Sequence, residues 1–370
     1  MKIQRLGLVA SVALVGSIAL TACGSDDNAG SPGASSSSTT TSACPKGGTL
    51  NGEGSSAQKN AIEEAISSFQ DECAGTTINY NPTGSGAGIK QFTAGQVDFA
   101  GSDSALKTVE KDGVVESDAA AKFCGSPAWN LPMVTGPIAL AYNIAGVDSL
   151  TLTPSVLAGI FNGKITNWND PAIAALNSGV TLPALGIQAV HRAEDSGTTE
   201  NFTKYLKAAA PSDWTIDPSK SWTAPGGVAA QGSDGVAKQV KSTDGSIGYV
   251  EWGFAIDDGL NVAQIDNGGG AVELTAESAG KAVAAATVVG TGKDLALKLD
   301  YATKAPGAYP VILVTYEIVC SAGNADLGPL LKSFLGYTAT DGQTTLADLG
   351  AAPLPAEIQT KVIDSVTAIS

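Results

Sequence analysis

One short stretch of the chain gathers several side chains that could do chemistry. The segment AVHRAEDSGTTENF contains the chain's single histidine, His191, followed by Arg192 and the acids Glu194 and Asp195. A hydroxyl-rich turn at 196–198 then leads into a segment with helical spacing. Free amides at a helix start attract negative charge, and a nearby guanidinium strengthens that attraction. The stretch therefore favours an anion site, with acid–base catalysis as the alternative.

Three more turns carry similar chemistry, each between a predicted strand and a predicted helix. A serine or threonine at a helix start usually only caps backbone amides, so one such turn would mean little. Four turns at one end of a sheet are better explained as a shared anion site, because ligands bind where the carboxyl ends of parallel strands meet. The residues are Ser55, Ser56 and the Ala57 amide in GEGSSA, Ser85 in PTGSGAG, Ser102 and Asp103 in GSDSA, and Ser196, Gly197 and Thr198 in the fourth turn.

Catalytic, nucleotide and metal sites lack their usual signatures. No GxSxG nucleophile elbow occurs, and a lone strand histidine such as His191 is usually packed or solvated. The segment GSGAG has GxGxG spacing, whereas dinucleotide binding needs GxGxxG. One histidine and no CxxC pair cannot complete a zinc site. We therefore expect a binding protein with no enzymatic activity, no metal and no cofactor.

The elements expected around these turns alternate strands with helices, which predicts an α/β fold. The first unit has strands at 48–52, 76–82 and 97–102, separated by a helix whose apolar residues recur between 62 and 69 and by a second helix at 87–95. A βαβαβ order implies a parallel, right-handed sheet. The second unit has amphipathic segments at 153–161 and 169–177, strands at 186–192 and 246–252, and helices at 198–210, 234–242 and 275–289.

Two long apolar segments are expected to connect the units. Residues 134–146, with a crossing point at Gly136 and Pro137, predict a strand leaving the first unit, and 309–320 predict a strand returning to it before two terminal helices. Two crossings make a hinged clamp. The predicted parts are a signal peptide at 1–22, a tether at 23–46, a first lobe at 47–138 plus 312–370, and a second lobe at 139–311.

The charge balance excludes one class of partner. The 370 residues carry a formal net charge of −15, and no lysine and arginine cluster occurs. Nucleic-acid binding needs a basic face, so we expect none. A small anion remains possible because salt screens the net charge beyond about 10 Å, whereas local dipoles and one arginine act at contact distance.

The first residues have the features of a secretion signal. Lys2 and Arg5 precede an apolar run from Leu6 to Leu20, shorter than the ~20 residues that a membrane-spanning helix needs. The run ends in LTAC, which resembles the bacterial lipobox and implies cleavage before Cys23 and acyl chains on that residue; an ordinary signal peptide is the alternative. More than one acyl chain anchors a protein stably. The following Ser/Thr/Gly-rich segment predicts a flexible tether.

The four remaining cysteines predict two disulfides. An even number outside the cytoplasm favours disulfides over metal ligation. Three pairings are possible among Cys44, Cys73, Cys124 and Cys320. Cys44 leads into the first strand and Cys73 ends the following helix, which places both at the same end of the sheet. This favours Cys44 with Cys73 and leaves Cys124 with Cys320.

Five segments together resemble the phosphate-binding proteins of bacterial phosphate ABC importers. They are LNGEGSSA, NPTGSGAGIKQFTAGQVDFAGSD, HRAEDSGTTENFTKYL, QGSDGVAKQV and GSIGYVEW, in the order that the family has. The resemblance implies a two-lobed periplasmic-binding-protein fold, each lobe a mixed sheet flanked by helices, joined by two hinge strands. It also implies high-affinity capture of inorganic phosphate in the cleft between the lobes.

The family's binding residues can be placed on this sequence. The acid that orients the arginine falls on Glu194, where the family commonly has aspartate, and Asp195 stands where glycine is frequent; the Asp195 carboxylate must therefore point away from the anion. The family's aromatic residue is also missing at Ala57, where only the amide is needed. The implied phosphate ligands are Ser55, Ser56, Ala57, Ser85, Asp103, Arg192, Ser196, Gly197 and Thr198.

Asp103 has a specific role in this interpretation. A dehydrated dianion recovers its lost hydration from amides, hydroxyls and one guanidinium. Phosphate at neutral pH still carries an O–H that a carboxylate can accept, whereas sulfate carries none. A site built around one hydrogen bond can reject an analogue that lacks it by roughly 10⁴ to 10⁵. The alternative is that Asp103 merely caps a helix.

The partners and location follow from the resemblance. We expect a monomer outside the cytoplasm, attached to the cell membrane only by its lipid, that delivers phosphate to the permease and ATPase subunits of an ABC importer. The alternatives are a binding protein for arsenate or sulfate, a phosphatase using the cleft, and a phosphate sensor or adhesin on the same scaffold. Arsenate also carries a proton, so the Asp103 argument disfavours only sulfate.

Overall fold

The computed structural model describes residues 44–110 and 113–370. The predicted signal peptide, the lipid attachment site Cys23 and most of the predicted tether lie outside these residues. In the part of the chain that is described, no helix combines the length and the apolar character needed to cross a membrane.

The centre of the fold is a mixed β-sheet. Nine strands of the described chain form it, in the order β2-β1-β3-β14-β4-β8-β6-β7, with β9 also paired to β4. β1 runs parallel to β2 and β3, and β6 runs parallel to β7 and β8, whereas β14 is antiparallel to β3 and β4. The strands are β1 Gly48–Gly54, β2 Thr76–Asn81, β3 Phe99–Ser102, β4 Ala128–Asn143, β6 Gln188–Arg192, β7 Val228–Ala230, β8 Ser246–Glu251, β9 Asn261–Val262 and β14 Ile312–Cys320.

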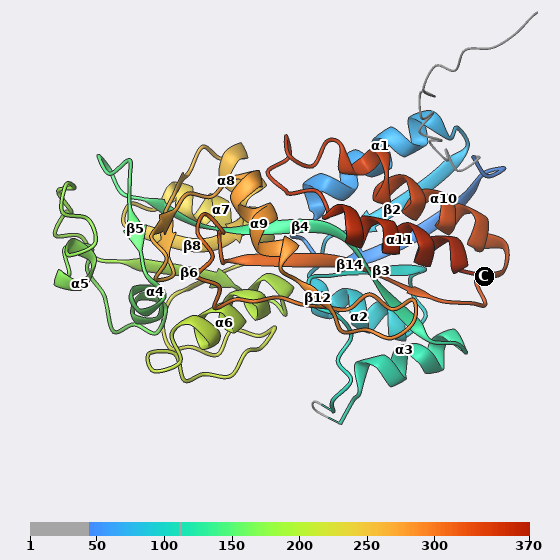
Figure 1. The fold of residues 1–370 in the computed structure, drawn as a ribbon, viewed down its shortest axis with the longest axis horizontal. Helices are drawn as coiled ribbons and strands as arrows, with labels where there is room; N and C mark the ends of the chain where they lie inside the picture. Colours follow the sequence, from blue (N-terminus) through green and yellow to red (C-terminus); the bar gives the residue numbers. More distant parts are fainter. Residues whose placement is uncertain (1–43, 111–112) are drawn as a thin grey trace, which may run out of the picture. The chain divides into compact units, whose positions relative to one another are not determined.

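Helices cover the faces of both halves of this sheet (Figure 1). The helices around β1–β3 are α1 Lys59–Glu72, α2 Ser85–Thr93, α3 Glu116–Cys124, α10 Gly328–Ala339 and α11 Ala356–Ala368, with 3-10 turns η1 Ala325–Leu327 and η2 Asp341–Gln343. The helices around β6–β8 are α4 Pro154–Phe161, α5 Pro171–Ala174, α6 Gly197–Ala209, α7 Gly232–Ser242, α8 Trp252–Asp257 and α9 Ala276–Ala284. Smaller sheets join β5 Thr151–Leu152 with β10 Gln264–Asp266 and β11 Ala271–Val272, and β12 Thr287–Val288 with β13 Leu297–Lys298.

Two long strands connect the halves, and both were predicted. β4 and β14 run side by side between the two groups of elements (Figure 1). β4 pairs with β14 up to Pro137 and with β8 from Ile138 onward, so one strand serves both halves of the sheet. The result is the two-lobed α/β architecture expected from the sequence. The residue boundaries of the lobes stay a prediction.

The sequence misjudged some elements of this fold. The helix predicted at 275–289 ends at Ala284, and Thr287–Val288 instead pairs antiparallel with Leu297–Lys298. Its start was predictable, since the Thr275 and Ser278 side chains form a capping box. Its end was not, because the β-branched pair takes a strand conformation once a partner strand is present. The mixed sheet expected for each lobe is confirmed in the first lobe, where β14 lies antiparallel beside β3 while β1 is parallel to β3.

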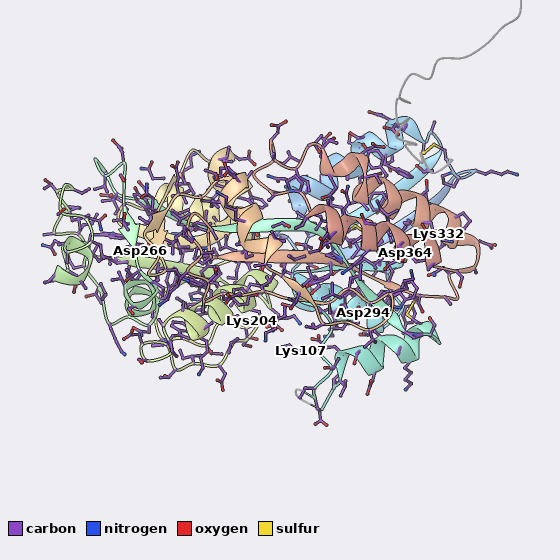
Figure 2. The ribbon with its side chains drawn as sticks, viewed as in Figure 1. Lys107, Lys204, Asp266, Asp294, Lys332 and Asp364 are labelled. Carbon is purple, nitrogen blue, oxygen red and sulfur yellow. A yellow bond between two sulfur atoms is a disulfide. The ribbon has the colours of Figure 1, made fainter. Side chains whose placement is uncertain are left out.

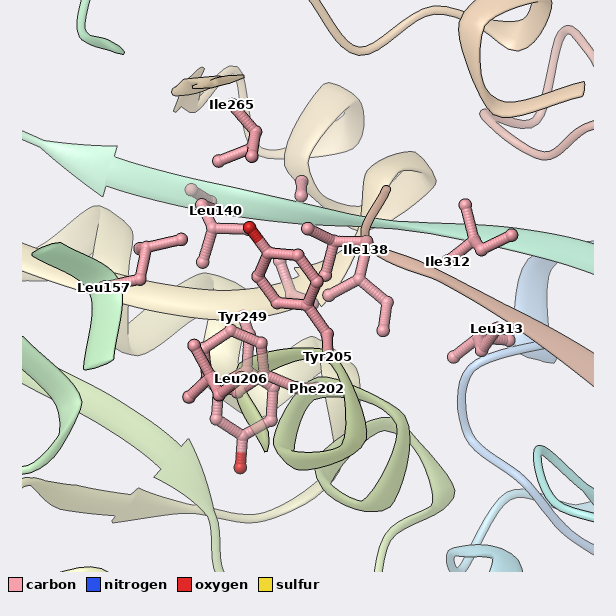
Figure 3. Packing of buried hydrophobic residues seen from close by; sticks show 14 of the residues in the cluster. Ile138, Leu140, Leu157, Phe202, Tyr205, Leu206, Tyr249, Ile265, Ile312 and Leu313 are labelled. Carbon is pink, nitrogen blue, oxygen red and sulfur yellow. The ribbon is translucent and has the colours of Figure 1, made fainter. Parts of the chain in front are cut away.

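Buried apolar side chains hold α6 against the sheet of the second lobe. Figure 3 shows Phe202, Tyr205 and Leu206 of α6 packed near Ile138 and Leu140 of β4. Phe202 and Tyr205 have no exposed surface. This packing fixes the first turn of α6, which carries the fourth predicted anion turn.

Both predicted disulfides are present. Cys44 is bonded to Cys73, and Cys124 is bonded to Cys320. The first pair ties the start of the described chain to the end of α1. The second pair joins the end of α3 to the end of β14 across 196 residues of sequence. It therefore restrains a much longer loop of the unfolded chain than the first, which spans 29 residues.

We expect the long-range disulfide to contribute more stability. The Cys124→Ala, Cys320→Ala double variant should lose about 2–4 kcal/mol of unfolding free energy, since a cross-link over a longer loop removes more entropy from the unfolded chain. The Cys44→Ala, Cys73→Ala variant is the matched control. Its loss of unfolding free energy should be smaller than that of the first variant by about 1–2 kcal/mol. Urea denaturation of both variants measures this difference, and the opposite order would contradict the loop-length explanation.

Candidate anion-binding site

The predicted turns meet at the carboxyl ends of the central strands. Residues 55–57 follow β1, and Asp103 follows β3, which is parallel to β1 and next to it. Ser85 is the first residue of α2. On the other lobe, Arg192 is the last residue of β6, and Gly197 is the first residue of α6. The strand order therefore brings residues distant in sequence to one place.

A cluster of hydroxyls surrounds Asp103. Its Oδ1 accepts hydrogen bonds from Ser55 Oγ at 2.5 Å and from Thr315 Oγ1 at 2.7 Å, and its Oδ2 accepts one from Ser85 Oγ at 3.0 Å. The Ala57 amide donates to Ser55 Oγ at 3.0 Å. Asp103 is only 3 % exposed. The cluster thus offers one acceptor carboxylate among several O–H groups.

A second cluster surrounds Arg192, which is 2 % exposed. Its Nε and Nη2 donate to Glu194 Oε1, the former at 2.7 Å. Its Nη1 donates to Thr198 Oγ1 at 3.1 Å and to Ser233 Oγ at 3.3 Å, and its Nη2 also donates to Ser56 Oγ at 2.7 Å. Glu194 in turn accepts from the Gly232 amide. A carboxylate on one side and three hydroxyls on the other hold the guanidinium plane in place.

The two clusters contact each other across the lobes. Ser56 of the first lobe lies against Arg192 and within 3.0 Å of Ser233 Oγ, both in the second lobe. Asn201 Nδ2 on α6 donates to the Asp103 carbonyl at 2.7 Å. Gly197 permits this approach, because a Cβ atom there would lie 2.5 Å from the Asp103 Cβ and 2.6 Å from Ser85 Oγ. The first turn of α6 thus lies directly against the Asp103 cluster.

Ion pairs near α6 also join the lobes. Lys107 Nζ, on the loop after β3, lies 3.5 Å from Glu200 Oε1, and Lys204 Nζ lies 3.3 Å from the same oxygen. Figure 2 labels both lysines. Lys220 Nζ lies 2.9 Å from Glu116 Oε1 at the start of α3. The charges of these lysines lower the pKa of Glu200 to about 2, against the opposing effect of its burial. Glu200 is therefore ionised at neutral pH.

Burial changes the protonation of Asp103. Burial raises the pKa of this carboxyl and the charge of Glu251 adds to the rise, whereas the hydrogen bonds from Ser55, Thr315 and Ser85 oppose it; together these effects place the pKa at about 6. Asp103 is therefore mostly ionised at neutral pH and acts as an acceptor. It gains a proton in mildly acidic solution.

Some predicted residues have local structural roles. Ser196 is the N-cap of α6, and its Oγ accepts from the Thr199 amide at 3.3 Å. Ser102 Oγ donates to the Ser104 carbonyl at 2.7 Å rather than to the Asp103 cluster. The Asp195 side chain is exposed and accepts from Ser221 Oγ, so it points away from the clusters, as the sequence interpretation requires.

Three residues of the site were not predicted from the sequence. Ser233 and Glu251 stand in two segments that carry the family resemblance, QGSDGVAKQV and GSIGYVEW. The resemblance therefore pointed to these segments, but it did not indicate which residues the two side chains contact. Thr315 stands in the middle of the long strand β14, where no local pattern distinguishes it. All three are buried.

The His191 side chain packs against an aromatic residue. Its ring stacks on Trp222 with the centroids 5.0 Å apart, and its Nδ1 lies 2.9 Å from the Arg192 carbonyl. Within residues 44–110 and 113–370, no group of three or more His, Cys, Asp or Glu side chains could hold a metal ion. The site presents hydrogen-bond donors, one guanidinium and an acceptor carboxylate. These groups are suited to binding an oxyanion that still carries a proton.

Comparisons with known proteins agree with this chemistry. A family model described as a PBP superfamily domain matches residues 35–341. The chain is 44 % identical over 376 residues to the phosphate-binding protein PstS 3 of Mycobacterium tuberculosis, covering all of both chains. It is 33 % identical over 286 residues to the phosphate-binding protein PstS of Xylella fastidiosa, covering 76 % of this chain and 75 % of that one.

Solved structures share the fold. A high-affinity periplasmic phosphate-binding protein, PfluDING, matches with a TM-score of 0.68 at 22 % identity, covering 85 % of this chain and 93 % of that one. A phosphate-binding protein from Stenotrophomonas maltophilia matches with a TM-score of 0.65 at 21 % identity, covering 86 % and 93 %. With full-length relatives at 44 % identity and the same two-lobed fold, the chain belongs to the PstS family of phosphate-binding proteins.

Proposed function

We propose that the protein captures inorganic phosphate outside the cytoplasm, between its two lobes, and delivers it to the permease and ATPase subunits of a phosphate ABC importer. The proposed ligands are Ser55, Ser56, the Ala57 amide, Ser85, Asp103, Arg192, Ser196, Gly197 and Thr198, with Glu194 orienting the arginine. We also propose that acyl chains on Cys23 attach the protein to the cell membrane.

One observation supports phosphate most strongly. A single buried carboxylate, Asp103, lies among hydroxyl groups, and the first turn of α6 packs against it from the other lobe. The donors suit an oxyanion, and the acceptor suits one that still carries a proton. Sulfate would place only lone pairs against that acceptor, so the arrangement favours phosphate.

The ligands come from both lobes, which supports closure around the anion. Ser56, Ser85 and Asp103 belong to the first lobe, and Arg192 with the α6 turn belongs to the second. An anion that contacts both sets binds a closed arrangement more tightly than an open one, so it shifts the population toward closure. In this proposal the permease distinguishes the closed, loaded protein from the open one.

Calorimetry of the anion-stripped protein tests the proposal. Orthophosphate should bind tightly, and sulfate should bind far more weakly. Arsenate, which carries a proton as phosphate does, should compete. A titration in which orthophosphate gave no heat and did not raise the melting temperature would refute phosphate binding, and tight sulfate binding would reassign the ligand.

The arginine should not be replaceable by lysine. Arg192→Lys keeps the positive charge but cannot reproduce the planar contacts to Glu194, Ser56 and Thr198, so phosphate affinity should fall about thirtyfold. Lys281→Arg, the reverse exchange on the exposed face of α9, is the control and should bind normally. Equal affinities of the Arg192 variant and the wild type would show that only the charge matters.

A further inference from the structure

Glu251 is a buried acid to which the proposed function gives no role. It is the last residue of β8 and is 4 % exposed. Its Oε1 accepts a hydrogen bond from Thr198 Oγ1 at 2.6 Å. Its Oε2 is buried and has no hydrogen-bond partner among the described residues. A carboxylate in this state destabilises the folded protein, so it calls for another explanation.

The Thr198 hydroxyl links Glu251 to the arginine. A hydroxyl has one proton, and a carboxylate can only accept, so the proton of Thr198 points to Glu251. The Thr198 oxygen is then free to accept from Arg192 Nη1, at 3.1 Å. Arg192 thus lies between two carboxylates, Glu194 by direct contact and Glu251 through Thr198. With its proton engaged, Thr198 presents its backbone amide, not its hydroxyl, as the donor to an anion.

Glu251 also reaches the other half of the site. It lines a small cavity of about 20 Å³ together with Ala57 of the first turn and Thr315, the residue that donates to Asp103. Its charge is among the causes that raise the pKa of Asp103. One carboxylate therefore acts on both clusters, on Arg192 through a hydroxyl and on Asp103 through space.

We propose that Glu251 is a positioning residue of the phosphate site: it directs the Thr198 hydroxyl so that Arg192 is held in its binding geometry, and it borders the cavity shared with Ala57 and Thr315, next to the Asp103 cluster. This inference rests on the proposed function. It assigns two separate roles to Thr198: its backbone amide donates to the anion, and its hydroxyl oxygen accepts a hydrogen bond from Arg192.

The other groups that influence Asp103 must be counted in any pH experiment. Glu317 of β14 and Tyr80 of β2 interact electrostatically with it, in addition to Glu251 of β8. From α6 its neighbours are Gly197 and Asn201, which are uncharged. Glu251→Gln changes one of these charges and leaves the others in place.

The test compares the wild type with Glu251→Gln in phosphate titrations from pH 5 to pH 8. At pH 8, where Asp103 is ionised in both proteins, we expect about tenfold weaker phosphate binding by the variant, because the Thr198 hydroxyl then donates to a neutral amide oxygen and no longer to a charged carboxylate. In the ligand-free proteins, carbon NMR of the Asp103 carboxyl should show a lower pKa in the variant. Thermal stability should be unchanged or higher, since an unpaired buried charge is removed.

Four further variants sharpen the test. Glu251→Asp keeps the charge and should retain more of the shift in the Asp103 titration than Glu251→Gln does. Thr198→Val removes the hydroxyl through which Glu251 acts. The double variant Thr198→Val, Glu251→Gln should therefore bind phosphate no more weakly than whichever of the two single variants has the lower affinity. Glu273→Gln, at an exposed position, is the matched control and should behave as the wild type.

Two results would overturn the role of Glu251: equal phosphate affinity of Glu251→Gln and the wild type, or weaker binding with an unchanged Asp103 titration. The second result would reduce Glu251 to a structural support. A wild-type protein that bound no phosphate would instead refute the proposed function, and this outcome is distinguishable because the wild type is titrated in the same series.

Discussion

Replacing Asp103 with asparagine is expected to remove most of the preference for phosphate over sulfate. The carboxylate can only accept a hydrogen bond, whereas the asparagine amide can also donate one, so sulfate no longer faces a purely repulsive contact. Discrimination that depends on one hydrogen bond amounts to roughly 10⁴ to 10⁵, and the variant should lose most of it. Competition of sulfate against phosphate in a calorimetric titration measures the change.

The matched control for this experiment is Asp217→Asn, because the Asp217 side chain is 94 % exposed. It should exclude sulfate as the wild type does. If sulfate competed no better against Asp103→Asn than against this control, Asp103 would only be a structural residue at the end of β3.

Acidic solution should reproduce the effect in the wild type. The pKa of Asp103 is raised to about 6, so the carboxyl gains a proton as the pH falls through that value and can then donate to sulfate. Selectivity for phosphate should therefore be highest above pH 7 and should decline toward pH 5. Selectivity that stayed constant over this range would contradict the acceptor role.

A second carboxyl near the site should control stability. Glu317, on β14, is 1 % exposed, and its burial raises the pKa from 4.5 to about 8, with the charge of Asp103 adding to the effect and a hydrogen bond with Gln58 opposing it. The folded protein then keeps a proton that the unfolded chain releases above pH 4.5. Stability from this group is present at low pH and is lost as the pH rises from about 4.5 to 8.

The expected loss across this window is about 5 kcal/mol, because each pKa unit corresponds to about 1.4 kcal/mol. Glu317→Gln imitates the protonated acid at every pH, so the variant should show a much flatter stability profile and should be more stable than the wild type at pH 8. Urea denaturation from pH 5 to pH 9 measures both profiles. Asp103, whose pKa is raised from 3.8 to about 6, contributes a further loss of stability as the pH rises toward 6 in both proteins.

The exposed Glu357→Gln variant provides the comparison for Glu317→Gln and should keep the slope of the wild type. A Glu317→Gln profile as steep as that of the wild type would mean that the Glu317 carboxyl is ionised in the folded protein. Its burial would then have to be offset by partners other than Gln58.

The sequence was sufficient where local pattern determines structure. Apolar spacing identified α1 and α6, and strand runs identified β1, β6 and β14, because the periods of helix and strand are properties of a few consecutive residues. The alternation of these elements placed Ser56, Asp103, Arg192 and the α6 turn at the carboxyl ends of the strands. The predicted disulfides followed from the same order of elements.

Only the tertiary structure determined how the site is supported. Asp103 and Thr315 are 212 residues apart, and Ser56 and Ser233 are 177 apart, so no local pattern links them. Thr315 acquires its role because β14 returns antiparallel beside β3, and Glu251 acquires its role because β8 lies next to β6 in the sheet. The sequence by itself determined which groups could bind an oxyanion. The packing of distant strands decided which protons those groups keep, because burial and neighbouring charges exist only in the folded chain.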